Sequence, residues 1–99
     1  MTPVRVLHVV GRMHRAGIET WLMSLLRRLD RREVQFDFCV NTLQEQDYDS
    51  EIASLGSALF PIASYRHSPG YFAELTRILQ REGPFDVIHC HEQLRNGSI

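Results

Sequence analysis

The stretch at residues 4–29, VRVLHVVGRMHRAGIETWLMSLLRRL, decides the fold of this 99-residue chain. It begins with a valine-rich run, which is typical of a β-strand that is covered on both faces. A turn with Gly11 and Gly17 follows, where the backbone can bend sharply or approach a ligand closely. Apolar residues then recur at helical spacing: Ile18, Leu22, Leu25, Leu26 and Leu29. The stretch predicts a strand, a turn and a helix whose N-terminus offers free N–H groups to an anion above the sheet edge.

Three further stretches have the pattern of β-strands. Apolar and polar residues alternate at 34–40, and shorter apolar runs lie at 57–62 and 85–90. Pro61 cannot donate a hydrogen bond to a neighbouring strand, so the third strand should be short and lie at an edge. Strands that alternate with helices imply a parallel sheet with right-handed crossovers. The predicted fold class is α/β, a Rossmann-like parallel sheet of strand order 3-2-1-4 with flanking helices.

Two further helices should connect these strands. Asp47 is expected to cap a short helix that ends at Gly56. Ser68 and Pro69 have the pattern of an N-cap followed by a proline at the first helical position, so a longer helix should begin there. The expected apolar face of this helix consists of Phe72, Leu75, Ile78 and Leu79.

The composition fits one small globular domain. The chain is 43% hydrophobic and 23% charged, and its net charge of −1 gives no reason to expect a nucleic acid partner. All 11 basic residues are arginine, which excludes a phosphate-loop lysine within these residues. No apolar run approaches the ~20 residues of a membrane helix, and no signal peptide is expected. Cys39 and Cys90 lack metal or redox spacing, so we expect two buried, reduced cysteines in a cytoplasmic protein.

Ligands of open parallel sheets bind beyond the carboxyl ends of the strands, where the winding reverses. For the order 3-2-1-4 this position lies between the first and fourth strands, so the stretches at 11–19 and 89–97 should converge there. The turn matches neither the phosphate-loop motif nor Gly-x-Gly-x-x-Gly. The N–H groups from Ala16 to Ile18 are expected to face a diphosphate, and a simple turn at Gly17 is the alternative.

His89 and His91 lie two residues apart on the fourth strand, so both should point to one face of the sheet and Cys90 to the other. A zinc site would need a third ligand from elsewhere, such as His8, and we predict no metal. The pair is interpreted either as packed or hydrogen-bonded side chains, or as a site where His91 holds polar ligand groups such as sugar hydroxyls. His8 is expected to be a core histidine.

Two groups of basic residues can each be interpreted in two ways. In the turn between the first strand and the first helix, His14 and its neighbours Arg12 and Arg15 either contact an anionic ligand or form a solvated loop. The second group ends the first helix and consists of Arg27, Arg28, Arg31 and Arg32. These arginines either complement the helix C-terminus or form a basic patch that docks an anionic lipid-linked acceptor or the membrane surface. Trp21 is expected in the core.

The order of four segments resembles glycosyltransferase family 4, and the resemblance covers nearly the whole chain. VLHVVGRMHRAGIETWLMSLLRRL at 6–29 resembles the family's opening strand, its loop ending in Gly-Gly-x-Glu and its leucine-rich helix. REVQFDFCV at 32–40, DYDSEIASLGSALFPI at 47–62 and FDVIHCHEQLRNG at 85–97 resemble the next strands and the short helix. The likeness is greatest to members that build bacterial exopolysaccharides and capsules.

The resemblance implies a GT-B fold, in which two Rossmann-like domains face each other across a cleft. Residues 1–99 would be part of the N-terminal, acceptor-side domain of a longer protein, whose C-terminal domain binds the donor. The implied activity is retaining transfer of a sugar from a nucleotide-sugar to a saccharide or lipid-linked acceptor in polysaccharide biosynthesis. No cofactor or metal is implied, and the implied location is cytoplasmic, with peripheral contact to the inner membrane face as an option.

The resemblance also assigns residues. Ala16 and Gly17, followed by Ile18, match the loop that touches the donor diphosphate, although the family favours glycine where Ala16 stands. Apart from the resemblance, we predict that His14, His91 and Glu92 bind the acceptor. These 99 residues alone should not catalyse transfer, because the donor domain is missing from them. The alternative hypothesis is a free-standing, flavodoxin-like α/β binding or interaction module without catalysis.

Overall fold

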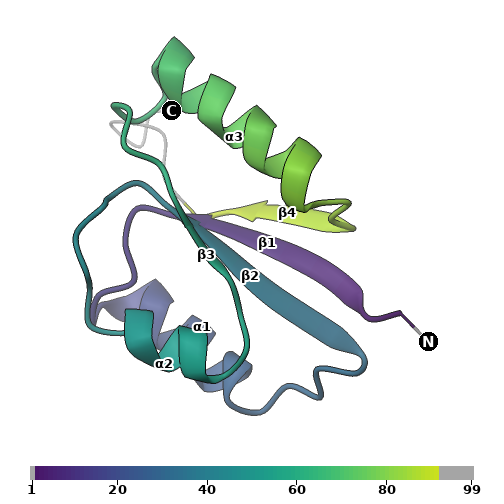
Figure 1. Ribbon diagram of the computed structural model, residues 1–99. Helices are drawn as coiled ribbons and strands as arrows, with labels where there is room; N and C mark the ends of the chain where they lie inside the picture. Colours follow the sequence, from purple (N-terminus) through teal and green to yellow (C-terminus); the bar gives the residue numbers. More distant parts are fainter. Residues whose placement is uncertain (1, 92–99) are drawn as a thin grey trace.

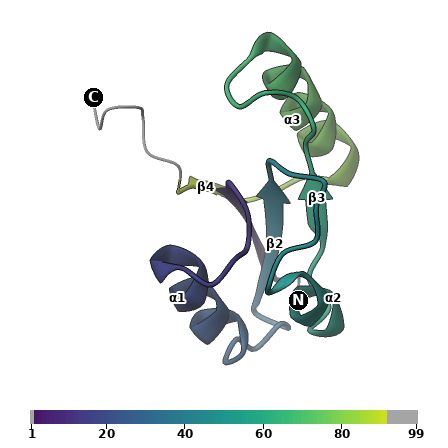
Figure 2. The same ribbon diagram turned by 90° about the vertical axis from the view of Figure 1, so that its left-hand side faces the viewer.

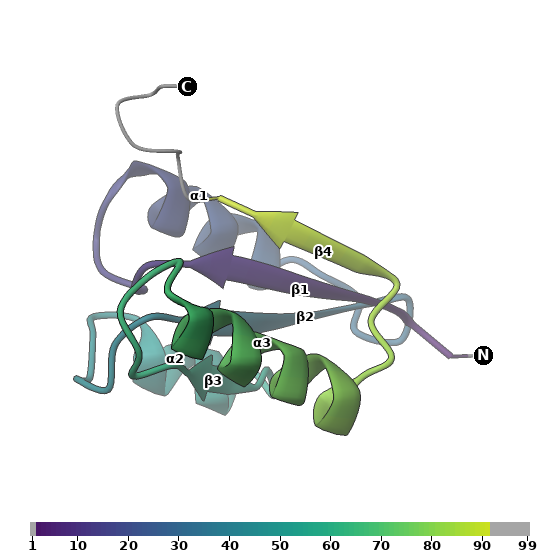
Figure 3. The ribbon, with the colours of Figure 1, turned by 90° about the horizontal axis from the view of Figure 1, so that it is seen from above.

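Four parallel strands form one sheet in the order β3-β2-β1-β4. The computed structural model describes residues 2–91. The strands are β1 (Val4–Val10), β2 (Val34–Val40), β3 (Leu59–Pro61) and β4 (Val87–Cys90). Seen from above, β1 runs between β4 and β2 (Figure 3). The predicted α/β class, the strand order and the short edge strand with Pro61 are confirmed.

Helices cover both faces of the sheet, as expected for right-handed crossovers. They are α1 (Gly17–Leu26), α2 (Asp49–Ser54) and α3 (Pro69–Glu82). Figures 1 and 2 show α1 and α2 on one face and α3 on the other. The sheet therefore divides the apolar interior into two layers, one on each of its faces.

The larger layer lies between the sheet and the helices α1 and α2. Phe38 is at its centre, with no part of its side chain exposed. Other buried members come from the turn after β1 and from α1, including Met13, Leu22 and Met23. The layer on the α3 face is smaller and is built from Leu7, Val9, Cys39, Ile62 and Tyr71. Because neighbouring residues of a strand point to opposite faces, β1 and β2 supply both layers.

Two expectations about buried side chains are wrong. Trp21 is 54% exposed, and Ile18 and Leu25 are also exposed, because α1 turns Leu22, Met23 and Leu26 toward the sheet. The helix therefore carries a second apolar stripe that the described residues leave uncovered. Cys39 is buried as predicted, but Cys90 is exposed because β4 is the edge strand of the described sheet.

The helix starts are partly as predicted. Ser68 caps α3, since its Oγ accepts a hydrogen bond of 3.1 Å from the N–H of Tyr71, and Pro69 is the first helical residue. Tyr71 is buried against the sheet, whereas Phe72 is half exposed, which corrects the predicted face. Asp47 does not cap α2. Its carboxylate instead accepts a 2.8 Å hydrogen bond from the backbone N–H of Arg15.

A buried carboxylate on β2 links β1 to the segments that lead into the neighbouring strands. Asp37 on β2 is almost fully buried, and its Oδ1 accepts hydrogen bonds from the N–H of Ala58 at 2.9 Å and from the Gln35 amide at 3.0 Å. Its Oδ2 lies 3.1 Å from the guanidinium of Arg5 on β1. The same guanidinium donates to the carbonyl of Glu82 and lies over the Phe85 ring. One ion pair thus connects β1, β2 and the segments that lead into β3 and β4.

Candidate functional site

An open pocket of about 520 Å³ lies at the carboxyl ends of β1 and β4, where the winding of the sheet reverses. Its lining combines the turn after β1, the start of α1, one residue after β3 and the end of β4. It is lined by Val10, Gly11, Arg12, His14, Gly17, Ile18, Glu19, Arg66 and His91. The structure thus brings together four of the predicted site residues, which are His14, Gly17, Ile18 and His91. Glu92 lies outside the described residues.

The N-terminus of α1 opens onto this pocket without a capping side chain. Ala16 is the N-cap residue, and its side chain makes no cap hydrogen bond. The first N–H groups of a helix have no partner within the helix, and they carry partial positive charge. Ala16 has φ of −139° and ψ of 177°, an extended conformation that alanine adopts freely. Alanine at this position therefore does not disturb the loop.

Gly17 faces open space. A methyl group built on its Cα would meet nothing within 4 Å, and its φ lies outside the positive range that requires glycine. The local backbone therefore gives no reason for glycine at this position. The missing side chain does let a ligand approach the backbone closely at this position.

Asp47 and Tyr48, which directly precede α2, hold the turn in place. The backbone N–H of Tyr48 donates to the carbonyl of Met13 at 3.0 Å, and Asp47 receives the N–H of Arg15. The hydroxyls of Thr20 and Tyr48 lie 2.9 Å apart, which connects α1 to the start of α2. The start of α1 is therefore positioned before any ligand arrives.

His14 and Glu19 lie at one side of the pocket. The Nδ1 atom of His14 is 3.8 Å from a carboxylate oxygen of Glu19 and 3.3 Å from the carbonyl oxygen of Arg12. The Glu19 side chain is largely buried, and its charge lies in the first turn of α1, where the helix dipole favours an anion. An acidic group and an imidazole at the pocket wall are suited to hydrogen bonding with the hydroxyls of a sugar.

His91 is held by two contacts with β1. Its backbone N–H donates to the carbonyl of Val9 at 2.9 Å, and its Nε2 lies 2.9 Å from Nδ1 of His8. Burial, with the nearby His89 ring, lowers the pKa of His91. Burial and the two neighbouring rings lower the pKa of His8 to about 4. His8 is a buried core histidine, as predicted, and both rings are neutral at pH 7.

Arg66 is a pocket residue that the sequence analysis missed. It follows β3, and it lines both the main pocket and an adjoining hollow of about 440 Å³. Arg12 lines both hollows as well. The loop after β3 begins at the same edge of the sheet as the loops after β1 and β4, because the carboxyl ends of parallel strands meet there. This topology was the one available signal for Arg66.

Asn41 has a structural role at this edge. Its side-chain amide donates to the carbonyls of Ile62 at 3.0 Å and Ser64 at 2.8 Å, and its backbone N–H donates to the carbonyl of Gly11. The end of β2 thus fixes the loops that follow β1 and β3. This residue positions Arg12 and Arg66 through their loops.

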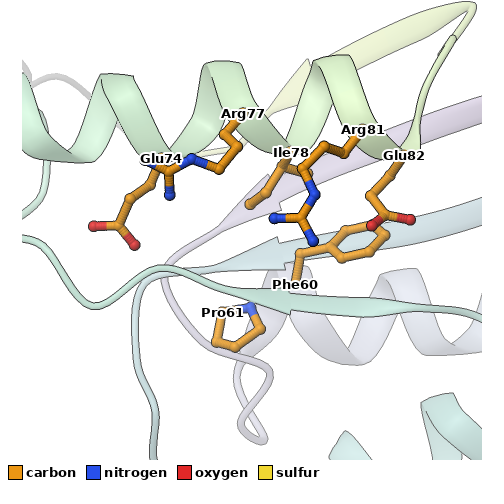
Figure 4. Close-up of a pocket in the computed structure, with 7 residues that line it drawn as sticks. All are labelled: Phe60, Pro61, Glu74, Arg77, Ile78, Arg81 and Glu82. Carbon is orange, nitrogen blue, oxygen red and sulfur yellow. The ribbon is translucent and has the colours of Figure 1, made fainter.

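Another hollow, of about 230 Å³, lies between α3 and β3 (Figure 4). Arg81 points from the helix toward the strand, Arg77 runs along the helix toward Glu74, and Glu82 lies beside Arg81. The two positive and two negative charges offset each other. This hollow contains none of the predicted site residues, so it does not compete with the pocket at the strand ends.

Much of the arginine group after α1 is engaged within the chain. The Arg27 guanidinium binds both carboxylate oxygens of Glu51, at 2.6 and 2.8 Å, and that contact lowers the pKa of the Glu51 carboxyl group. Arg32 pairs with Asp30 at 3.1 Å. Since α1 ends at Leu26, these side chains do not lie in its last turn. Within residues 2–91, no helix has the length and apolar character needed to cross a membrane.

The sheet order defines a Rossmann-like domain, and its pocket lies at the switch point, where sheets of this kind bind ligands. The particular family follows from the sequence. The model of Glycosyltransferase Family 4 matches residues 15–98, so the chain belongs to this family. The resemblance drawn from the sequence motifs is confirmed.

Two curated relatives are similar over nearly the whole chain. EpsF of Bacillus subtilis (strain 168), provisionally named a glycosyltransferase, is 41% identical over 97 residues, covering 96% of this chain and 25% of EpsF. The capsular polysaccharide biosynthesis glycosyltransferase CapH of Staphylococcus aureus is 26% identical over 96 residues, covering 97% and 26%. The chain thus spans about a quarter of the length of either relative. No solved structure matches it significantly.

Proposed function

We propose that this chain is the acceptor-side part of a retaining glycosyltransferase that moves a sugar, of hexose type, from a nucleotide-sugar donor. The proposed acceptor is a saccharide or a lipid-linked saccharide, and the proposed process is polysaccharide biosynthesis. The family match and the name of CapH support this class of reaction. Family membership also favours a transferase over a free-standing binding module.

The uncapped N-terminus of α1 at the switch-point pocket is the observation that carries the proposal. The leaving group of the reaction is a nucleoside diphosphate, which gains negative charge as the bond to the sugar breaks. Free N–H groups at Gly17 and Ile18 can stabilise this charge without a metal ion. Arg12 and Arg66 add positive charge at the same pocket.

Other residues of the pocket lining suit the polar parts of a sugar. His14, Glu19 and His91 offer imidazole and carboxylate groups to hydroxyls. Nε2 of His91 contacts His8, so Nδ1 is the ring nitrogen that remains to form a hydrogen bond with a hydroxyl. We assign His14 and His91 to the acceptor, and we extend this assignment to Glu92.

The proposed division of labour places donor binding in a second Rossmann-like domain beyond these residues. The chain covers about a quarter of its relatives, which leaves length for such a domain. Residues 1–99 expressed alone should therefore neither transfer a sugar nor hydrolyse a nucleotide-sugar. Turnover by this segment would contradict the proposed division. We place the whole protein in the cytoplasm, with peripheral membrane contact for a lipid-linked acceptor.

Substitution of Gly17 tests the proposed diphosphate contact. In the whole protein, Gly17→Ala should leave the fold intact, because the added methyl group meets nothing within 4 Å. The same methyl group would hold the diphosphate away from the N–H groups. We expect kcat/KM for the nucleotide-sugar to fall roughly tenfold or more. The measurement is initial transfer rates over a range of donor concentrations, with thermal unfolding of the same samples.

Gly56→Ala is the matched control. Gly56 has a φ of 89°, and a methyl group there would contact the Arg31 side chain, so this variant strains the backbone. It lies outside the pocket lining. We expect a lower unfolding temperature with kcat/KM unchanged for the folded enzyme, the reverse of the Gly17 result. If Gly17→Ala retains full kcat/KM, the diphosphate contact is wrong.

A further inference from the structure

The structure places three histidine rings side by side on the α1 face of the sheet. Parallel pairing puts His8 of β1 in register with His89 of β4. His91 lies two residues further along, and alternation returns its side chain to the same face. The ring centroids of His89 and His91 are 3.9 Å apart, and that of His8 lies 5.1 Å from His91 and 5.7 Å from His89.

One nitrogen from each ring falls in a single small volume. The three atoms all lie within 4.8 Å of one another, and Nδ1 of His8 lies 2.9 Å from Nε2 of His91. Nitrogen ligands of a tetrahedral zinc ion, each bound at about 2.0–2.1 Å, are roughly 3.3 Å apart. Small changes in side-chain angles would therefore bring the three nitrogens to ligand distance. We propose that His8, His89 and His91 bind a divalent transition metal, with Zn²⁺ as the expected ion.

Hydrogen bonding leaves His8 incompletely satisfied. Nδ1 faces His91, but Nε2 is buried and has no hydrogen-bond partner among the residues that the structure describes. The ring packs against Phe36 and Phe38 and is 3% exposed, so water does not replace the missing partner readily. A buried, unsatisfied imidazole is costly for a purely structural residue. Because the ligand atom would be Nδ1, which faces His91, ligation leaves this cost unchanged, and the positions of the three rings carry the proposal.

The chemistry of the three side chains selects the class of ion. Neutral imidazole suits zinc, copper and nickel, whereas magnesium and calcium prefer oxygen ligands. His8 is buried, His91 is half-buried and His89 is exposed, which leaves one side of the cluster open to a water molecule or another ligand.

The nearest acidic group supports a cation here. Glu19 of α1 lines the pocket together with His91, and its charge acts on the His91 ring. A bound ion would add positive charge beside the uncapped helix N-terminus. The sugar transfer proposed above requires no ion, so the metal site extends beyond that function, although the two sites share His91.

Zinc titration of the whole, untagged protein tests the proposal. We expect calorimetry to give one Zn²⁺ per chain, with a dissociation constant on the order of micromolar or tighter. Added zinc should also raise the unfolding temperature, since it binds the folded state. Cobalt should give the visible absorption of a tetrahedral Co²⁺ complex. Absence of saturable zinc binding would overturn the site.

His89→Gln removes one ligand from an exposed position, so the fold should tolerate it. Zinc affinity should then fall at least about tenfold, and the zinc-dependent rise in unfolding temperature should shrink. His67→Asn is the matched control, because His67 has a φ of 63°, which asparagine tolerates, and it lies outside the cluster. Equal zinc affinity in His89→Gln and the original protein would contradict the proposal. Gly17→Ala should bind zinc normally, so failures of the two proposals are distinguishable.

Discussion

Replacing Phe38 by alanine is expected to lower the free energy of unfolding of this domain by about 4 kcal/mol. The side chain is 0% exposed, and it lies in the larger apolar layer between the sheet and α1 and α2. Removal of the ring both forfeits its burial and leaves a cavity, because β2 is held between β1 and β3 and cannot collapse into the space. The His8 ring, 5.5 Å away between centroids, would lose a packing partner.

Hydrogen exchange with mass spectrometry of the whole protein would measure this change, because peptides from β1 and β2 report on this domain alone. Leu43→Ala is the control, since Leu43 is 71% exposed in the loop after β2. It should change the free energy of opening by no more than about 0.5 kcal/mol. Similar protection of β1 and β2 in Phe38→Ala and the original protein would show that the α1 layer does not form the core.

Replacing Asp37 by alanine is the second large expected effect, a loss of about 3 kcal/mol. The carboxylate is 3% exposed and accepts a hydrogen bond from the partly buried N–H of Ala58, so its removal takes that partner away. Arg5 would lose its ion pair but remains partly exposed, and water can solvate it. The loss is therefore smaller than for a fully buried ion pair.

A double-mutant cycle of Asp37→Ala and Arg5→Ala separates the ion pair from the other contacts. We expect a coupling energy of about 1 kcal/mol between the two residues, with the rest of the Asp37 effect independent of Arg5. Asp30→Ala is the control, because Asp30 and Arg32 form an exposed pair and should contribute much less. Equal losses from Asp37→Ala and Asp30→Ala would contradict the proposed role of burial.

The sequence predicts the sheet well because each strand has its own local pattern and several strands indicate the same fold. Valine-rich and alternating runs each mark a strand, and the crossover rule leaves few ways to arrange four parallel strands. The faces of the helices are less predictable. In α1 the apolar residues occupy more than one face, so periodicity alone did not separate the buried Met23 from the exposed Trp21. Tertiary packing chose between these faces.

The candidate site was predictable where strand topology governs it. The switch-point rule located the turn after β1 and the end of β4, and alternation put His89 and His91 on one face. The contact of His8 with His91 needed the register between β1 and β4, which single-sequence patterns do not contain. Arg66 was missed because it has no motif, and only the shared edge of the parallel strands brings its loop to the pocket.

The register between β1 and β4 also bears on how this gene can change over time. His89 faces His8 across a parallel pair, and Cys90 faces the opposite side. Loss of a single codon within β4 would transfer every following side chain to the other face, so Cys90 and the histidines would exchange sides. Substitutions at one position alter one side chain, whereas a length change there alters both layers at once. Insertions and deletions should therefore accumulate in the loops of this lineage and be purged from β4.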